Sequence, residues 1–293
     1  MKHTEKAFAK INLYLNVTGR RSDGFHDVES VMQEIDVYDL LHFELFPAEE
    51  TKIELSFSEP CDLPTDERNL IVRAAKAFLE RAKKSAHVKI LLEKRIPMAA
   101  GLAGGSADAA ATLRALDVML PNALTKEALI VIAASLGSDI PFCLLGGRAL
   151  CTGRGEIMER LPIHEGGYGV LANTEESSST PKAYGALDAI YSNFDASVPI
   201  PKDLAARGVL DAVKAGEAPP FYNIFEEAVF PLCPKAERAK VLMLEMGAEA
   251  AMMSGSGPSV FCITKNLKEA KKIEGALSAM GYASRCFSFT GNA

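Results

Sequence analysis

The sequence predicts an α+β protein of two domains, and three observations carry this prediction. The chain has 293 residues, which at about 150 residues per domain gives two domains. Segments with alternating apolar residues, typical of strands, are interspersed with segments of helical periodicity. After about residue 161 the expected order is strand, helices, strand, strand, helix, strand, which is typical of a ferredoxin-like unit. We therefore expect domains over residues 1–160 and 161–293.

The first domain opens with an alternating segment that predicts a half-buried strand. Ile11, Leu13, Leu15 and Val17 share one face of this strand, and the polar residues 18–27 predict a loop. Helices are predicted over residues 69–82 and 126–136, and between them in an alanine-rich segment; Thr125 caps the last one and Gly137 ends it. Strands are predicted over residues 31–35, 40–45, 53–57, 88–93, 142–145 and 148–151, the last two joined at Gly146-Gly147.

The second domain is predicted from the same two periodicities. Its strands are expected over residues 168–172, 250–253, 259–264 and 283–289. Its helices are expected over residues 223–229, 235–246 and 267–280, with polar or helical segments over residues 180–189 and 200–215. The helices are expected to cover one face of the resulting sheet.

Composition and charge exclude several classes of function. The formal net charge is -6 and the pI is about 5.5, whereas a protein that binds the nucleic-acid backbone usually has a basic face. The most apolar stretch, residues 129–150, is interrupted by glycines, Asp139, Pro141 and Arg148, so it predicts no membrane span. The six cysteines form no CxxC pair and are expected to be reduced thiols. We therefore expect a cytoplasmic protein with neither nucleic acid nor membrane as a partner.

A glycine-rich loop at residues 97–108 is the strongest local signal for chemistry. It connects a predicted strand to the alanine-rich helix, and Gly101, Gly104 and Gly105 allow its backbone to approach a ligand closely. The N–H groups at the start of the helix favour phosphate, and Ser106 adds a hydroxyl. The spacing fits neither the Walker A loop nor GxGxxG. The alternative is a tight strand-to-helix connection that binds nothing.

Three weaker signals have two interpretations each. Asp139 lies in the segment LGSDIPF, between a predicted helix and a predicted strand, where it is either a functional carboxylate or a turn former. Lys10 and Asn12 lie on the polar face of the first strand, which is either functional or simply solvated. The segment SGSGPS at residues 254–259 either clamps phosphates or forms an ordinary hairpin.

The order of these segments is more specific than any one of them. AKINLYL, RSDGFHD, PMAAGLAGGSADAA, LGSDIPF and SGSGPS occur in the order that resembles the family of small-molecule kinases named for galactose, homoserine, mevalonate and phosphomevalonate. The resemblance implies a ribosomal-protein-S5-like N-terminal domain, a ferredoxin-like C-terminal domain and an active site between them. It also implies ATP and Mg²⁺ as cofactors.

Two segments resemble one branch of this family. AKINLYLNVTGRRSDGFHD and ERNLIVRAA are similar to the branch whose acceptor alcohol carries a cytidine diphosphate group. This resemblance implies ATP-dependent phosphorylation of the 2-hydroxyl of a cytidine diphosphate-linked methylerythritol, in the non-mevalonate route to isoprenoid precursors. We expect a monomer or a weak homodimer.

The resemblance also implies roles for individual residues. Asp139 is expected to be the general base with Lys10 beside it, and Asn69 to lie near the adenine. On the substrate side we expect Asn12, Thr180, His26 reading the cytosine edge, and Phe25, at a position where the family often has Tyr, stacking on the base. The resemblance further implies that the glycine loop wraps the ATP phosphates. Ser106 is expected near the metal, and no dedicated metal ligand is expected. The residues of this loop are Pro97, Met98, Ala99, Ala100, Gly101, Leu102, Ala103, Gly104, Gly105, Ser106 and Ala107.

Two rival functions remain to be weighed against this prediction. A related kinase could use another acceptor, such as homoserine or mevalonate, but RSDGFHD argues against it because those acceptors present no cytosine. A non-catalytic nucleotide- or RNA-binding module could use the same fold. The acidic pI and the joint presence of Lys10 and Asp139 argue against that module.

Overall fold

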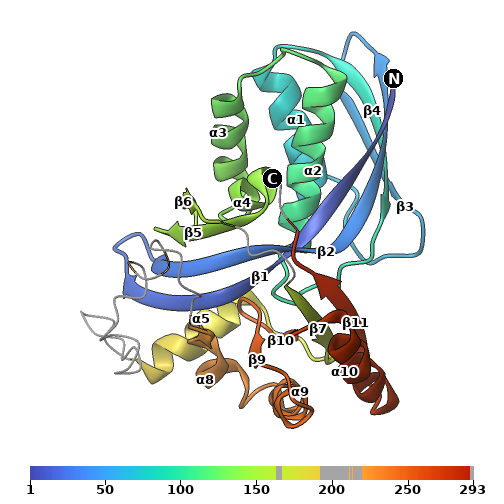
Figure 1. The fold of residues 1–293 in the computed structure, drawn as a ribbon. Coiled ribbons are helices and arrows are strands. Elements are labelled where there is room, and N and C mark those ends of the chain that lie inside the picture. Colours follow the sequence, from blue (N-terminus) through green and yellow to red (C-terminus); the bar gives the residue numbers. More distant parts are fainter. Residues whose placement is uncertain (163–166, 192–210, 212, 214–219, 291–293) are drawn as a thin grey trace. The chain divides into compact units, whose positions relative to one another are not determined.

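The computed structural model describes residues 1–162, 167–191, 211, 213 and 220–290 (Figure 1). Residue contacts divide the chain into two units that are interleaved along the sequence. Unit 1 consists of residues 1–9, 37–97 and 103–146, and unit 2 of residues 10–36, 98–102 and 147–293. Two long strands, β1 (Lys2–Arg20) and β2 (His26–Pro47), contribute residues to both units. The predicted division at residue 160 stays a prediction.

Unit 1 is a sheet with its helices gathered on one face (Figure 1). The strand β4 (Ala86–Glu93) pairs antiparallel with β2 and parallel with β3 (Lys52–Phe57). The helices are α1 (Leu70–Arg81), α2 (Gly104–Met119), α3 (Lys126–Leu136) and α4 (Ile140–Leu145). Phe43, Phe78 and Phe142 are fully buried in this unit. The alanine-rich sequence of α2 suits its place among the other helices, because small side chains allow close packing.

Unit 2 contains the predicted ferredoxin-like sheet. Its four strands lie in the order β11-β7-β10-β9, all antiparallel, so the first strand in sequence is central and the last is at an edge. The strands are β7 (Tyr168–Asn173), β9 (Ala250–Met253), β10 (Val260–Thr264) and β11 (Ala283–Ser288). The helices are α5 (Thr180–Ile190), α8 (Phe225–Val229), α9 (Pro234–Glu245) and α10 (Leu267–Ala279). The predicted α+β class is confirmed.

Three short strands complete unit 2. The first, β5 (Arg148–Thr152), pairs antiparallel with β2 and with β6 (Ile157–Arg160). The third, β8 (Tyr222–Asn223), pairs parallel with β1. A core of apolar side chains lies between the sheet and the helices and includes Val170, Phe225, Met243 and Cys262.

Several predicted elements were wrong. Residues 142–145 are not a strand but part of α4, because four apolar residues have no readable period and Pro141 pre-sets a helical start. The first strand is not half-buried: β1 is buried on both faces over residues 9–17. The loop predicted over residues 18–27 is shorter, and the strands predicted over residues 31–35 and 40–45 are one, because β1 extends to Arg20 and β2 runs unbroken from His26.

The second half also departs from the prediction in places. The helix predicted over residues 223–229 is shorter, because Tyr222 and Asn223 pair with β1 before α8 begins. The strand β6 was not predicted. Apart from residues 211 and 213, the predicted segment 200–215 lies outside the described residues.

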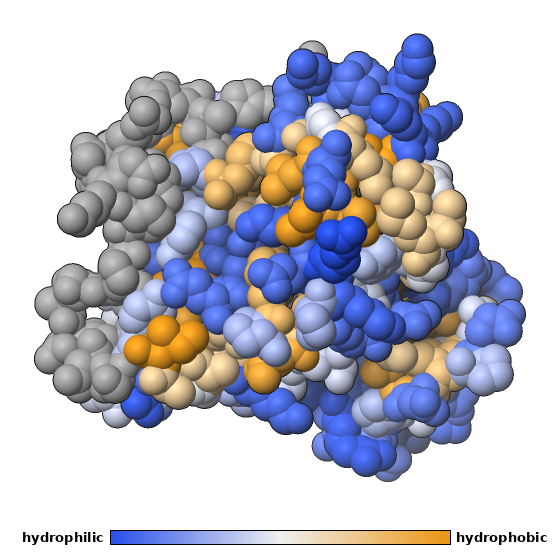
Figure 2. All heavy atoms as spheres, turned by 90° about the horizontal axis from the view of Figure 1, so that it is seen from below, coloured by the Kyte–Doolittle hydropathy of each residue, from blue (hydrophilic) through white to orange (hydrophobic). Residues whose placement is uncertain are grey.

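None of the helices in the described part of the chain is long and apolar enough to cross a membrane. The face shown in Figure 2 is predominantly hydrophilic, and its apolar side chains gather in separate small groups. Exposed large apolar residues among the described ones include Val118, Val131 and Leu232, which lie on different segments.

Candidate active site

The start of α2 is built to leave backbone N–H groups without protein partners. Ala103, the residue before the helix, is in the left-handed conformation with φ of 55° and makes no capping side-chain bond. The first turn carries no acidic residue. Because the first N–H groups of any helix have no intrahelical acceptor, this start can bind an anion. Ser106 lies in the same turn, half-buried, and its hydroxyl makes no hydrogen bond among the described residues.

The tip of the glycine loop is packed within unit 2 against the loop between β9 and β10. Gly101 has φ of 75°, and a Cβ there would lie 2.0 Å from the carbonyl oxygen of Ser254. The Ser254 hydroxyl donates to the Gly101 carbonyl at 3.0 Å. Ser254 N–H also bonds the Ser259 carbonyl at 2.9 Å. Residues 254–259 are therefore a hairpin connection that also supports the glycine loop.

Lys10 and Asn12 are not on a solvated face. Lys10 is only 4% exposed and Asn12 1%. The Lys10 ammonium donates to Asn12 Oδ1 at 2.7 Å, Asn12 Nδ2 donates to Ser30 Oγ at 2.8 Å, and Ser30 donates to the Tyr14 carbonyl at 2.8 Å. Because Ser30 gives its proton to a carbonyl, it must accept from Asn12. This chain fixes the orientation of the Asn12 amide and hence the place of the Lys10 ammonium.

His26 is held by helix α5 in unit 2. Its Nε2 lies 2.7 Å from Asp188 Oδ1, and its ring stacks on Tyr184 with centroids 4.7 Å apart. Tyr184 and Asp188 are four residues apart, so they lie on one face of α5. Tyr184 in turn packs edge-on against Phe225. Neither Tyr184 nor Asp188 was predicted from the sequence, since no local pattern pairs them with His26.

Phe25 and Thr180 are accessible, in contrast to His26. The Phe25 ring is 52% exposed, and the Arg154 guanidinium lies over it at 4.8 Å from the ring centroid. Thr180 is exposed at the start of α5, and its hydroxyl lies 3.1 Å from the Ser256 hydroxyl. An exposed ring backed by a guanidinium can stack on a planar ligand.

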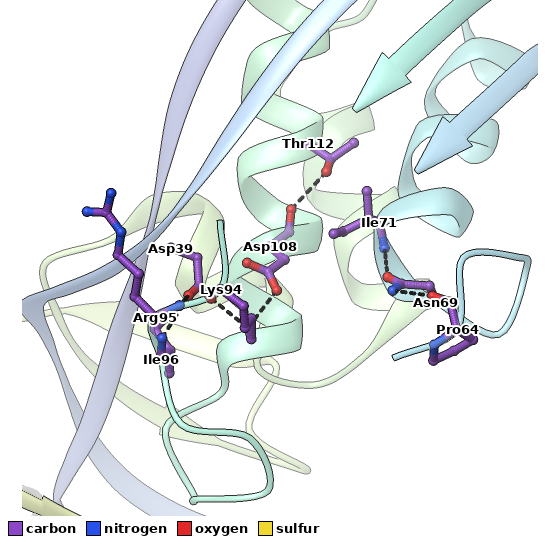
Figure 3. Close-up of polar contacts among 9 residues, drawn as sticks. All are labelled: Asp39, Pro64, Asn69, Ile71, Lys94, Arg95, Ile96, Asp108 and Thr112. Carbon is purple, nitrogen blue, oxygen red and sulfur yellow. Dashed lines mark hydrogen bonds and ion pairs between the residues drawn. The ribbon is translucent and has the colours of Figure 1, made fainter. Parts of the chain in front are cut away.

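Asn69 and Asp139 lie at helix starts in unit 1. Asn69 Oδ1 accepts from Ile71 N–H at 3.0 Å and its Nδ2 donates to the Pro64 carbonyl at 2.8 Å (Figure 3). Asp139, half-buried, immediately precedes α4, with φ of -83° and ψ of -13°, and makes no capping bond. Asp139 was predicted to lie between a helix and a strand, but it lies between the helices α3 and α4.

A cluster of three charged residues, Asp39, Lys94 and Asp108, lies at the start of α2 and was not predicted from the sequence. Lys94 donates to Asp39 Oδ2 at 2.5 Å and to Asp108 Oδ2 at 2.8 Å (Figure 3). Burial raises the pKa of Asp108 to about 7, with Lys94 opposing the rise and Asp39 adding to it. Lys94 directly follows a predicted strand and Asp108 ends the glycine-rich segment, but no local pattern joins either to Asp39.

The few possible protein ligands at the start of α2 fit a magnesium ion that binds together with the nucleotide. No group of three or more His, Cys, Asp or Glu side chains within the described ranges could hold a metal ion. Mg²⁺ in nucleotide sites is typically held by the phosphates, waters and one or two protein ligands, and the Ser106 hydroxyl can be one of them.

Comparison with known proteins places this chain in a family. Residues 69–147 match the GHMP kinases N terminal domain and residues 205–283 match the GHMP kinases C terminal domain. The chain therefore belongs to the GHMP kinase family, and it is an ATP-dependent small-molecule kinase.

Within this family the chain is similar to one kind of kinase. The 4-diphosphocytidyl-2-C-methyl-D-erythritol kinase of Exiguobacterium sibiricum is 41% identical over 276 residues, covering 93% of this chain and 92% of the relative. The protein of the same name from Alkaliphilus metalliredigens is 42% identical over 280 residues, covering 94% and 92%. A crystal structure of 4-(cytidine 5'-diphospho)-2C-methyl-D-erythritol kinase matches with a TM-score of 0.76 and 32% identity, covering all of both chains.

Proposed function

We propose that this kinase transfers the γ-phosphoryl group of ATP to the 2-hydroxyl of 4-diphosphocytidyl-2-C-methyl-D-erythritol, a step in the non-mevalonate synthesis of isoprenoid precursors. The observation that carries phosphoryl transfer is the uncapped start of α2 behind the glycine loop. The similarity over 93% of the chain to relatives named for this acceptor supports the choice of substrate. RSDGFHD, which contains Phe25 and His26, supports it as well.

The proposed chemistry is mainly positioning and charge stabilisation. Phosphoryl transfer passes through a transition state whose negative charge is spread over several oxygens. We assign residues 97–107 to the phosphates, with Asn69 on the adenine side. When bound, Mg²⁺ supplies charge neutralisation on the phosphates, and Ser106 would hold it.

Two residues are proposed to act on the reacting atoms. Asp139 accepts the proton of the acceptor hydroxyl, a task suited to a carboxylate. Lys10 stabilises the negative charge of the transferred group. The Lys10–Asn12–Ser30 chain supports this role, because it fixes the ammonium in one place. Asn12 and Thr180 are assigned to the substrate side.

His26 and Phe25 are proposed to recognise the cytosine. Stacking of a base on an aromatic side chain contributes about 1–3 kcal/mol, so Phe25→Ala should raise KM for the cytidine acceptor roughly tenfold and leave KM for ATP unchanged. Phe46→Ala is a matched control, because Phe46 is 40% exposed and also has a cation, Lys89, over its ring. Loss of folding stability with an unchanged acceptor KM would make Phe25 a loop anchor instead.

The experiment that tests the substrate is a coupled ADP-release assay with a panel of acceptor alcohols. Turnover should be strong with the cytidine diphosphate acceptor and small with homoserine or mevalonate. Equal or better turnover with homoserine or mevalonate overturns the proposal. We further propose that the enzyme works in the cytoplasm as a monomer or weak homodimer, which sedimentation at several concentrations tests.

A further inference from the structure

We propose that Asp39, Lys94 and Asp108 form a buried clamp that holds the two ends of the glycine loop in the geometry needed for the nucleotide. All three are positioning residues, because they bind the backbone and one another. The inference rests on the proposed function in that the glycine loop is the phosphate site. It adds residues that neither the family match nor the sequence motifs assign a role.

The entry to the loop is held by Asp39. Its carboxylate is fully buried on β2, and Oδ1 accepts from two consecutive backbone N–H groups, Arg95 at 2.5 Å and Ile96 at 2.7 Å (Figure 3). These are the last two residues before Pro97. A carboxylate that accepts two adjacent N–H groups fixes the direction in which the chain leaves β4.

The exit from the loop is held through Lys94. Its ammonium reaches from Asp39 to Asp108, which lies on α2 four residues after its first residue and is 2% exposed. The clamp therefore joins β2, the end of β4 and the start of α2 (Figure 3). Since the loop begins and ends at these elements, a shift of Lys94 moves both of its ends.

Gly104, the first residue of α2, lies directly against the clamp. A Cβ on Gly104 would lie 3.0 Å from Lys94 Nζ and 3.2 Å from Ile96 Cγ2. The helix start, whose N–H groups we propose for phosphate, thus lies so close to the lysine that a side chain at Gly104 would require Lys94 and Ile96 to shift. This contact connects the clamp to the binding groups themselves.

The charge of the cluster argues for a positional role rather than a stabilising one. Two carboxyl groups and one ammonium are nearly removed from water, with side-chain exposures of 0%, 3% and 13%. Buried ion pairs add little net stability compared with apolar side chains of the same shape, since desolvation offsets the attraction. Their directional hydrogen bonds do fix one arrangement of the backbone.

The test measures nucleotide binding without any acceptor, by titration with a non-hydrolysable ATP analogue and Mg²⁺. Asp108→Ala removes the group on α2 that Lys94 binds, and Gly104→Ala displaces the helix start from the clamp. Each should weaken binding at least tenfold. Lys94→Ala should do the same, and Lys94→Arg should restore part of the loss. The matched control is Asp117→Ala, the same substitution on the same helix outside the clamp, which should bind as wild type does.

Steady-state kinetics then separates positioning from general stability. The clamp variants should raise KM for ATP and leave KM for the acceptor unchanged. Unchanged nucleotide affinity in folded variants, judged by thermal unfolding, overturns the inference. Equal losses for nucleotide and acceptor also overturn it, because the cluster would then be a general stabiliser. If the wild type binds the analogue but phosphorylates a different acceptor, the proposed substrate fails while the clamp is still supported.

Discussion

The four helices of unit 1 begin in two different ways. The helices α1 and α3 are closed by side chains: Asn69 accepts from Ile71 N–H at 3.0 Å and Thr125 accepts from Ala128 N–H at 3.2 Å. The helices α2 and α4 begin at Ala103 and Asp139, and neither residue makes a capping bond. A capped helix start serves only to stabilise its own helix, whereas an uncapped start leaves backbone N–H groups available to another partner.

The contrast is sharpest at Asp139. Aspartate is among the best N-cap residues, yet this one has helical backbone angles instead of the extended angles usual at an N-cap, and it makes no capping bond. At Ala103 no capping group exists at all. The two uncapped starts are those that we propose for the phosphates and the general base, and the predictions below test the four starts and the charged groups proposed to act with them.

The largest expected effect is at Asp139. Asp139→Asn keeps the shape and removes the charge, and because general bases typically contribute about 10²–10⁴-fold, kcat should fall by that factor. Stopped assays at saturating ATP and acceptor measure it. Thr125→Ala is the control from a closed start: it should lower stability by about 1 kcal/mol with kcat unchanged.

Lys10 provides a second check on the same assignment. Lys10→Ala should also lower kcat, and the double variant should lose less than the product of the two factors, because residues that act as a unit are not additive. A near-normal kcat in a folded Asp139→Asn variant would mean that Asp139 only forms a turn and is not the general base.

A charge placed at the uncapped start of α2 should separate stability from binding. Gly105 has room for a side chain, since a Cβ would meet only Leu70 Cδ1 at 3.8 Å. Gly105→Asp should raise the melting temperature relative to Gly105→Asn, because a negative charge near a helix N-terminus contributes about 0.3–1 kcal/mol. The same charge repels phosphate, so KM for ATP should be roughly tenfold higher in the Asp variant than in the Asn variant. Equal KM values for this pair would mean that no phosphate binds there.

The buried carboxyl of Asp108 on α2 should make stability depend on pH. The pKa of Asp108 is raised by burial from 3.8 to about 7. Between these values the unfolded chain releases a proton that the folded protein keeps, so the free energy of unfolding should fall as pH rises from about 4 to about 7. Urea unfolding of wild type and Asp108→Asn across this range measures the effect, which should be absent from the difference between wild type and Asp117→Asn. A pH-independent difference for Asp108→Asn would contradict the shift.

The smallest expected effect is at the closed start of α1. Asn69→Ala should lower stability by about 1 kcal/mol, because Ile71 N–H loses its acceptor. Asn69→Asp keeps an acceptor and should retain most of that stability. A raised KM for ATP in Asn69→Asp would support the proposed place near adenine, and unchanged stability in Asn69→Ala would contradict the cap.

Local signals explain what could be predicted from the sequence. The bounds of α3 match the prediction, because Thr125 and Gly137 mark its two ends and apolar residues recur between them. The short α4 was wrong for the opposite reason, since its apolar run spans too few residues to show a period. The ferredoxin-like order was predictable because it depends only on the sequence of elements.

The sequence predicted which residues belong to the candidate site, but it did not predict how deeply they are buried or which residues they contact. Alternation placed Lys10 and Asn12 on one face, but it cannot show that both faces of β1 are buried. The clamp was missed because Asp39 and Lys94 are 55 positions apart in sequence. Contacts at that separation are set by strand pairing, which single-sequence patterns do not reveal.

The interleaving of the two units limits where the chain can be split and which segments can be exchanged between relatives by recombination. The chain passes from one unit to the other after residues 9, 36, 97, 102 and 146. A genetic break at any single point therefore leaves at least one unit without part of its own sheet or loop. We expect that such a protein changes by substitution within an intact chain, and that exchange of halves between relatives succeeds only when β1, β2 and the glycine loop come from compatible parents.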